Sequence, residues 1–268
     1  MTNLPAHGRI NCNRCFKGSA MIVFNETYRP EREWRITANP FAWGNSNPEV
    51  IVLGFSKGPT QTKKIDKLPD NDVAFRSQHT HMAKMLAHIG LIPDANGTYL
   101  TRAIEDSAGR FHFGSFVRCA VEFFDAKKND WHGTGGGILD KFFTSAFGAE
   151  VTHNCVDQHL VNLPSRTKLV VMFGMGTKLA YVKDCFKVYE HTRGGEWTWL
   201  NDVAYSDGKI TVVHVEHFAS LGQHIPNWLG QNVHKRSVYG LMAREAVALS
   251  GVHQYEMRPI KVPAPRQT

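Results

Sequence analysis

The chain has 268 residues, 42% of them hydrophobic, and its 31 Lys and Arg against 24 Asp and Glu give a formal net charge of +7. This length and apolar content fit one large domain with a sizeable core, and the positive surplus favours polyanionic partners. No apolar run reaches the roughly 18 residues of a membrane span, and the N-terminus lacks a signal-peptide pattern, so we expect a cytoplasmic protein with no membrane partner.

Short apolar runs alternate with helical patterns along the chain. The sequence predicts strands over 49–54, 115–121, 168–174 and 209–217, and helices over 81–91, 156–163 and 236–249. This order predicts an α/β fold, a three-layer sandwich whose central four-stranded, mainly parallel sheet is flanked by helices. We expect a single domain over 1–255 and a flexible tail over 256–268, where three prolines occur.

Polar and glycine-rich segments follow the predicted strands, where open parallel sheets place their ligands. Gly54 and Gly58 bound the turn GFSKGPTQ, which lacks the Gly-Lys-Ser/Thr ending of a nucleotide-binding phosphate loop. His217 stands at the end of the fourth strand, from which a side chain can reach a cleft. From the residues alone, an ordinary strand-to-helix turn remains open for 54–61, and a lone histidine at a strand end is more often structural than catalytic.

Cys12 and Cys15 form a CxxC pair that has no second such pair elsewhere in the chain. A reducing compartment disfavours a disulfide framework among the five cysteines. Their spacing does not say what the pair holds.

Taken in order, these segments resemble the uracil-DNA glycosylase superfamily, closest to its iron–sulphur (family 4/5-like) branch. That branch has an N-terminal CxxC, a turn of Gly-Glu-Ala-Pro-Gly type, a Pro-Phe-x-Gly segment, a strand ending Asn-x-x-Lys-Cys, a further cysteine and a strand ending His-Pro-Ser. Apart from the CxxC, no family motif is intact. The matching stretches are CNRC (12–15), VIVLGFSKGP (50–59), DVAFRSQ (72–78), SFVRC (115–119), NCVDQHLVNLPSRTKLVVMFG (154–174) and VVHVEHFAS (212–220).

The resemblance implies a structural 4Fe–4S cluster held by Cys12, Cys15, Cys119 and Cys155. Zinc suits four cysteines equally well by ligand type and is the alternative cofactor, and a chain without metal is the third possibility. Cys185 is left over, and we expect it to be an ordinary buried thiol.

The resemblance also implies a function: hydrolysis of the N-glycosidic bond of uracil, or another deaminated base, in single- or double-stranded DNA, by a monomer that flips the base out of the stack. Backbone amides of the 54–58 turn, which includes Gly54 and Phe55, would contact the base, and Ser115 would bind its polar edge. Phe75 would stack on the base, although a plain core aromatic is an equal alternative for Phe75. The catalytic residues implied are His217, Ser56 and Ser115. The DNA contacts implied are Lys57, Lys235 and Arg236 at phosphates, although each could equally be plain surface charge. Leu221, Ile225, Pro226 and Trp228 are the implied wedges.

Departures from the family pattern open a second interpretation. Phe55 and Ser56 stand where relatives carry an acidic residue or an Asn that orients water, and Phe55 cannot accept a proton. Either another group, with Asp72 and Glu216 as candidates, holds the water, or the chain binds damaged DNA or other nucleic acid with weak catalysis. The segment 126–150 resembles an insertion, either a flexible DNA-contacting loop or an unconstrained surface loop.

Overall fold

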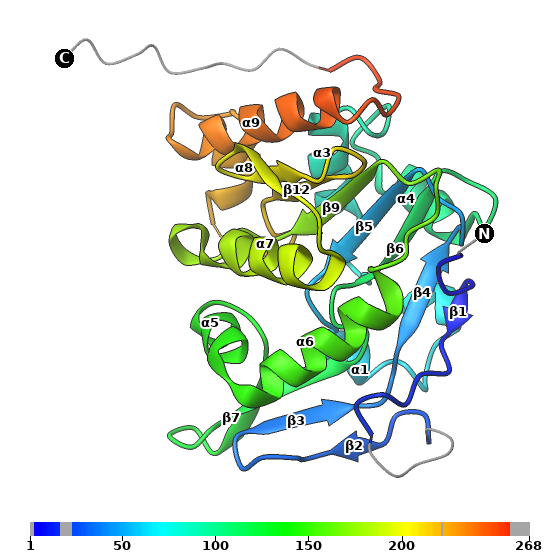
Figure 1. Ribbon diagram of the computed structural model, residues 1–268, viewed down its shortest axis with the longest axis vertical. Coiled ribbons are helices and arrows are strands. Elements are labelled where there is room, and N and C mark those ends of the chain that lie inside the picture. The colour runs from blue at the N-terminus through cyan, green and yellow to red at the C-terminus, as the bar shows by residue number, and fades with distance from the viewer. Residues whose placement is uncertain (1–2, 17–22, 221, 258–268) are drawn as a thin grey trace.

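The computed structural model describes residues 3–16, 23–220 and 222–257. Its centre is a parallel run of strands in the order β6-β5-β9-β12 (Figure 1), and antiparallel strands extend both sides. Within those ranges the sheet has eight strands, so the α/β class is confirmed and the predicted number of four is wrong. Its strands are β1 (Gly8–Arg9), β4 (Phe41–Gly44), β5 (Val50–Gly54), β6 (Phe111–Ser115), β9 (Leu169–Phe173), β10 (Thr198–Asn201), β11 (Ala204–Ser206) and β12 (Thr211–Val215).

A second, antiparallel sheet lies beside the first. Among the described residues it has four strands in the order β2-β3-β7-β8. They are β2 (Thr27–Tyr28), β3 (Trp34–Thr37), β7 (Ala120–Asp125) and β8 (Asp130–Gly133). The segment 126–150, left open by the sequence, therefore supplies a strand of this sheet, one helix and the start of a second rather than an unconstrained loop.

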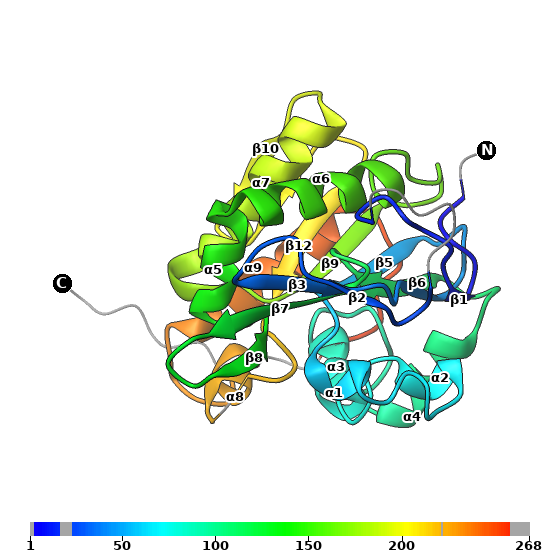
Figure 2. The ribbon, with the colours of Figure 1, turned by 90° about the horizontal axis from the view of Figure 1, so that it is seen from below.

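Helices cover the large sheet on opposite faces, with α6 and α7 on one and α3 and α4 on the other (Figure 2). α9 packs against β12 and α8 against α9. The helices are α1 (Pro59–Thr62), α2 (Asp70–Val73), α3 (His79–His88), α4 (Gly97–Glu105), α5 (Gly137–Thr144), α6 (Ala146–His159), α7 (Ala180–Arg193), α8 (His224–Trp228), α9 (Arg236–Leu249) and the short 3₁₀ helix η1 (Thr177–Leu179).

The central strands are buried along their whole length and are mostly apolar because helices cover both faces. Every residue of β5, β9 and β12 is buried, and burying one aliphatic side chain contributes roughly 1.5–3 kcal/mol. Local capping fixes where the helices begin: Asn96 accepts the Thr98 N–H at the start of α4, and Ser145 accepts the Gly148 N–H at the start of α6.

Most predicted elements are confirmed, and one strand is misplaced. The predicted strand over 115–121 is wrong, since β6 ends at Ser115 and β7 begins at Ala120. The chain bends between these two strands. In the bend, the N–H groups of Phe116 and Val117 donate to the carbonyls of Gly54 and Phe55, both at 2.8 Å. The helix predicted over 156–163 is the last part of α6, which begins ten residues earlier at Ala146 and ends at His159. Of the predicted tail, residues 258–268 lie outside the described part of the chain.

Candidate functional site

Several of the predicted site residues lie together at the carboxyl edge of the parallel strands. Gly54 ends β5 beside Ser115, its register partner at the end of β6. His217 follows β12, and a Cβ placed on Gly174, just after β9, would lie 3.9 Å from the His217 ring. Four neighbouring strand ends thus meet where open α/β sheets bind ligands.

Two aromatic rings cover Gly54. A Cβ at Gly54 would lie 3.5 Å from Phe75 and 4.0 Å from Phe218. The two rings meet edge to face with centroids 5.7 Å apart, and Phe218 also packs 5.1 Å from Phe173. Phe75 has a positive φ of 47°, which costs free energy in a non-glycine residue and is a feature that clusters at functional sites. Phe218, which sequence reasoning treated only as a departure from the family pattern, is therefore part of this site.

The side chains of Ser115 and Phe55 differ in whether they are available to a ligand. Ser115 is buried, and its hydroxyl makes no hydrogen bond to any described residue, so it can serve a ligand. Phe55 is also buried, but its ring packs against Phe142 of α5 and Tyr181 of α7. The Phe55 ring therefore belongs to the hydrophobic core, and a contact between the base and the backbone amide of Phe55 stays a prediction.

Ser56 is tied to the segment that resembled an insertion. Its Oγ lies 2.7 Å from the Oγ1 of Thr134, which follows β8. A Cβ on Gly133 would lie 2.8 Å from Pro59, so the hairpin and the 54–59 turn are in close contact. Thr134 was missed by sequence reasoning, since nothing local in GTGGG indicates contact with a residue nearly eighty positions earlier.

His217 is held neutral and in one tautomer. The ring is half-buried, and burial lowers its pKa to about 4 although the neighbouring Glu216 carboxylate opposes the shift. Its Nδ1 accepts the Ala219 N–H at 3.1 Å. In the neutral imidazole the proton therefore lies on Nε2, which becomes a hydrogen-bond donor.

The loop after His217 is fixed by neighbouring side chains. Glu216 Oε1 accepts the His217 N–H at 3.1 Å and the Ser220 hydroxyl at 2.8 Å. Its Oε2 pairs with Arg236, and the His81 ring bonds the Phe218 carbonyl at 3.0 Å. Because both Glu216 oxygens have structural partners, the hypothesis that Glu216 holds the attacking water is not supported; Asp72, the other candidate, is exposed on α2.

Several expected DNA contacts are contradicted by burial or pairing. Lys57 is only 1% exposed, and its Nζ donates to the Arg118 carbonyl, so it cannot reach a phosphate. Ile225 and Trp228 are buried in and beside the core and are not wedges. Arg236 is engaged with Glu216. Lys235 is exposed and Pro226 half-buried, as DNA contacts require, and Leu221 lies outside the described residues.

The four predicted metal-binding cysteines are electrostatic neighbours. The Cys15 thiol donates a hydrogen bond to Cys155, which lowers the pKa of Cys155 to about 7 and raises that of Cys15. Burial, together with the neighbouring Cys155 and Cys12, raises the pKa of Cys119 to about 12. Backbone N–H groups of Arg14, Asn39 and Arg118 lie at the sulphurs of Cys12, Cys119 and Cys155 respectively. Cys185 is a buried thiol elsewhere, beside Tyr181, as expected.

This set of donors fits a four-thiolate centre by its chemistry. Four cysteine sulphurs with N–H groups directed at them suit zinc or a 4Fe–4S cluster alike. The side chains as placed do not form a finished site: among the described residues, no three His, Cys, Asp or Glu are positioned to hold a metal ion.

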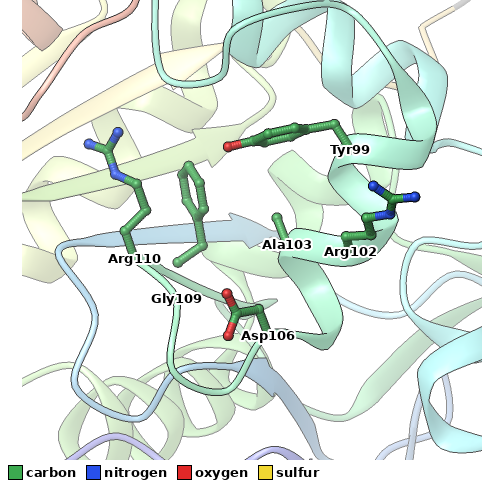
Figure 3. A pocket seen from close by; sticks show the side chains of 7 residues that line it. Tyr99, Arg102, Ala103, Asp106, Gly109 and Arg110 are labelled. Carbon is green, nitrogen blue, oxygen red and sulfur yellow. The ribbon is translucent and has the colours of Figure 1, made fainter.

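Two surface pockets lie away from the candidate base site and the cysteines. One, of about 250 Å³, is lined by Tyr99, Arg102 and Asp106 from the α4 region, together with Arg110 (Figure 3). Arg110 is already bound there, since its Nη2 lies 2.8 Å from Glu49 and 3.0 Å from the His253 carbonyl. The other, of about 460 Å³, lies between His88, Leu229 and Arg244.

Comparisons with known proteins neither add to nor contradict this description. No protein-family model matches the chain, and no curated protein matches it. In the part of the chain that the structure describes, no helix has the length and apolarity to cross a membrane.

Proposed function

We propose that this protein is a DNA glycosylase that hydrolyses the N-glycosidic bond of uracil, or another deaminated base, and leaves an abasic site. The observation that carries the proposal is the neutral His217 ring, whose Nδ1 is occupied by Ala219 and whose Nε2–H is free to donate at the strand edge shared with Gly54 and Ser115. A fixed neutral donor is suited to stabilising a base that leaves as an anion.

In the proposed reaction the flipped pyrimidine enters beside Gly54, where Phe75 can stack on it and the Ser115 hydroxyl can bond its polar edge. The C1′–N bond breaks, and its electron pair moves to the base. The His217 Nε2–H stabilises the developing charge on a carbonyl oxygen of the base. Water then adds to C1′ of the cation-like sugar, and its proton passes to solvent.

The hydroxyl pair Ser56–Thr134 is the group best placed in the turn to orient that water. The two oxygens lie 2.7 Å apart and the residues are half-buried. Hydroxyls can hold water by hydrogen bonds but cannot take its proton at neutral pH. We therefore expect slower excision than in an enzyme with a carboxylate at this position.

A structural 4Fe–4S cluster, or zinc in its place, belongs to the proposal and would be held by Cys12, Cys15, Cys119 and Cys155. Bound there, the group would crosslink the N-terminal segment to α6 and to the β6–β7 turn, and it has no step in the reaction. Exposed Lys235 and the positive net charge favour a DNA partner.

A second function, damage binding with weak or no turnover, is favoured by two observations. Phe55, in the place of a water-orienting residue, is buried in the core. The Phe218 ring covers Gly54, where the base would lie.

Single-turnover excision tests the proposal. A single-stranded oligonucleotide with one central uracil is incubated with excess protein and then cleaved with alkali. We expect cleavage at the uracil, a loss of about 100-fold or more in His217→Ala through the missing charge stabilisation, and unchanged activity in His191→Ala, an exposed histidine on α7. Binding of the same strand without cleavage would support the second function, and full activity of His217→Ala would remove His217 from the site.

A further inference from the structure

Two cations are buried beside three of the four cysteines, Cys12, Cys119 and Cys155. Lys57 and Arg118 are each 1% exposed, which is rare for either residue type without a charged partner. Lys57 Nζ donates to the carbonyl of Arg118, the residue immediately before Cys119. Arg118 Nη1 donates to the Phe41 carbonyl at 3.3 Å, and Nη2 lies 3.3 Å from the His112 ring.

No carboxylate in the described part of the chain balances these charges. Throughout the described ranges, neither Lys57 nor Arg118 forms an ion pair with Asp or Glu. Neutral carbonyls and an imidazole satisfy hydrogen bonds but leave the buried positive charge uncompensated, which costs several kcal/mol per ion. Burial lowers the pKa of Lys57 to about 7, so both side chains stay fully charged at neutral pH only if an anion lies nearby.

The fold makes space for the Arg118 guanidinium. A Cβ on Gly114, at the end of β6, would lie 1.9 Å from Arg118 Nη1. That contact is impossible, so a glycine is needed at 114 for the side chain to lie as it does. The buried cation is therefore an integral part of the packing.

The neighbouring groups that can become anions are the cysteine sulphurs. Cys119 and Cys155 act electrostatically on Lys57, and Cys155 and Cys12 act on Arg118. Cysteines carry charge only as thiolates, the form that binds metal. Four thiolates around Zn²⁺ or a doubly charged 4Fe–4S core keep two negative charges, and Lys57 with Arg118 supplies two positive ones.

We infer that Lys57 and Arg118 are the charge-balancing residues of a four-thiolate metal site, and that they stabilise the bound metal group without contacting DNA or the reacting atoms. The inference rests on the four-cysteine part of the proposed function and is independent of the base chemistry. The inference also explains why the Lys57 side chain points into the protein, although the family resemblance implies that its turn contacts the base.

Metal retention by full-length variants tests this inference. Iron, zinc and acid-labile sulphide per chain are measured after anaerobic purification, and the rate of metal loss to excess chelator is then followed. Lys57→Met removes one buried charge at nearly constant length. Arg14→Gln is the matched control, because Arg14 also lies beside Cys12 but is 42% exposed and paired with Asp157.

We expect Lys57→Met to lose metal about ten times faster or more, whereas Arg14→Gln stays within about two-fold, since solvent screens exposed charges. If Lys57→Met does not fold, Arg118→Lys and Arg118→Gln replace it, and we expect the charge-keeping variant to retain metal and the neutral one to lose it. Equal loss rates in Lys57→Met and the wild type, or in the two Arg118 variants, would overturn the inference.

The measurements distinguish a failure of this inference from a failure of the proposed function. A wild-type chain that holds neither iron nor zinc after expression with both metals supplied would overturn the four-thiolate site and this inference. Uracil excision by that same preparation would still support the glycosylase. Metal-loaded protein without excision would leave the charge-balancing role standing and contradict the enzyme.

Discussion

At the scale of single residues, the site depends on side chains whose states are set by their surroundings. His217 is neutral because its ring is desolvated, and it is a donor at Nε2 because Ala219 occupies Nδ1. The sequence identifies His217 from its place after a strand, but not its tautomer, which depends on the loop conformation. Lys57 was mistaken for a phosphate contact because a lysine in a glycine-rich turn is normally on the surface, and its burial depends on the distant Arg118.

Phe218 offers a test at this scale. We expect Phe218→Ala to raise the single-turnover rate of uracil excision several-fold, because the ring covers Gly54 and must move before a base can enter. The variant should also be less stable by about 1–3 kcal/mol, since contacts with Phe75 and Phe173 are lost.

Phe186→Ala is the matched control for that substitution, because Phe186 is also partly buried but stacks on Trp199. It should lose stability and leave the excision rate unchanged. A fall in excision in Phe218→Ala, with DNA binding intact, would mean that the ring assists base capture instead of blocking it.

At the scale of elements, the helices and strands with a clear hydrophobic pattern were predictable from the sequence, and the short paired strands were not. The helix expected over 236–249 coincides with α9, and the apolar runs at 49–54, 168–174 and 209–217 contain β5, β9 and β12. β6 was misplaced because FHFGS is less continuously apolar than SFVRCAV, and the chain bends at Phe116 to bond the 54–55 carbonyls. Two-residue strands such as β1 carry no periodic signal.

The β7–β8 hairpin allows a test of how an element supports the site. Thr134→Val removes the hydrogen bond to Ser56 and should reduce stability by about 0.5–1.5 kcal/mol. We expect excision to slow several-fold with DNA binding unchanged, because the Ser56 hydroxyl loses its fixed orientation.

Thr144→Val on α5 provides the same chemical change at a hydroxyl that bonds only its own helix. That control should retain the wild-type excision rate. If both Thr134→Val and Ser56→Ala excise uracil at the wild-type rate, the hydroxyl pair has no part in positioning water.

At the scale of the whole molecule, two groups of candidate functional residues come from different sets of elements. The strand ends carry the candidate base site, while the four cysteines come from the N-terminal segment, the β6–β7 turn and α6. The spacing of the cysteines suggested this grouping only through the family resemblance. The buried cations beside them could not be foreseen, because burial of Lys57 is decided by tertiary packing.

The buried histidines predict how the stability of the whole chain depends on pH. Burial lowers the pKa of His88 to about 3 and that of His214 to about 4, against 6.5 for the exposed group. Between about pH 6.5 and 4 the unfolded chain therefore binds protons that the folded chain does not. Stability should fall as pH falls, by up to about 1.4 kcal/mol per pH unit for each such histidine.

Urea denaturation at pH 7, 6 and 5 measures that dependence, and we expect the midpoint to decrease at each step. His214→Gln should give a lower midpoint at pH 7 but a shallower decline, because one titrating group is removed. A midpoint that is constant or rises toward pH 5 would contradict the buried neutral state of these rings.

The central claim is that the strand-edge site removes a base from DNA, and the most direct measurement is of the two products together. Wild-type protein in excess is incubated with a single-stranded oligonucleotide containing one uracil, and free uracil and abasic sites are quantified over time. We predict equal amounts of both, with neither formed at an appreciable rate by His217→Ala. Binding of the oligonucleotide with no uracil released would contradict the claim.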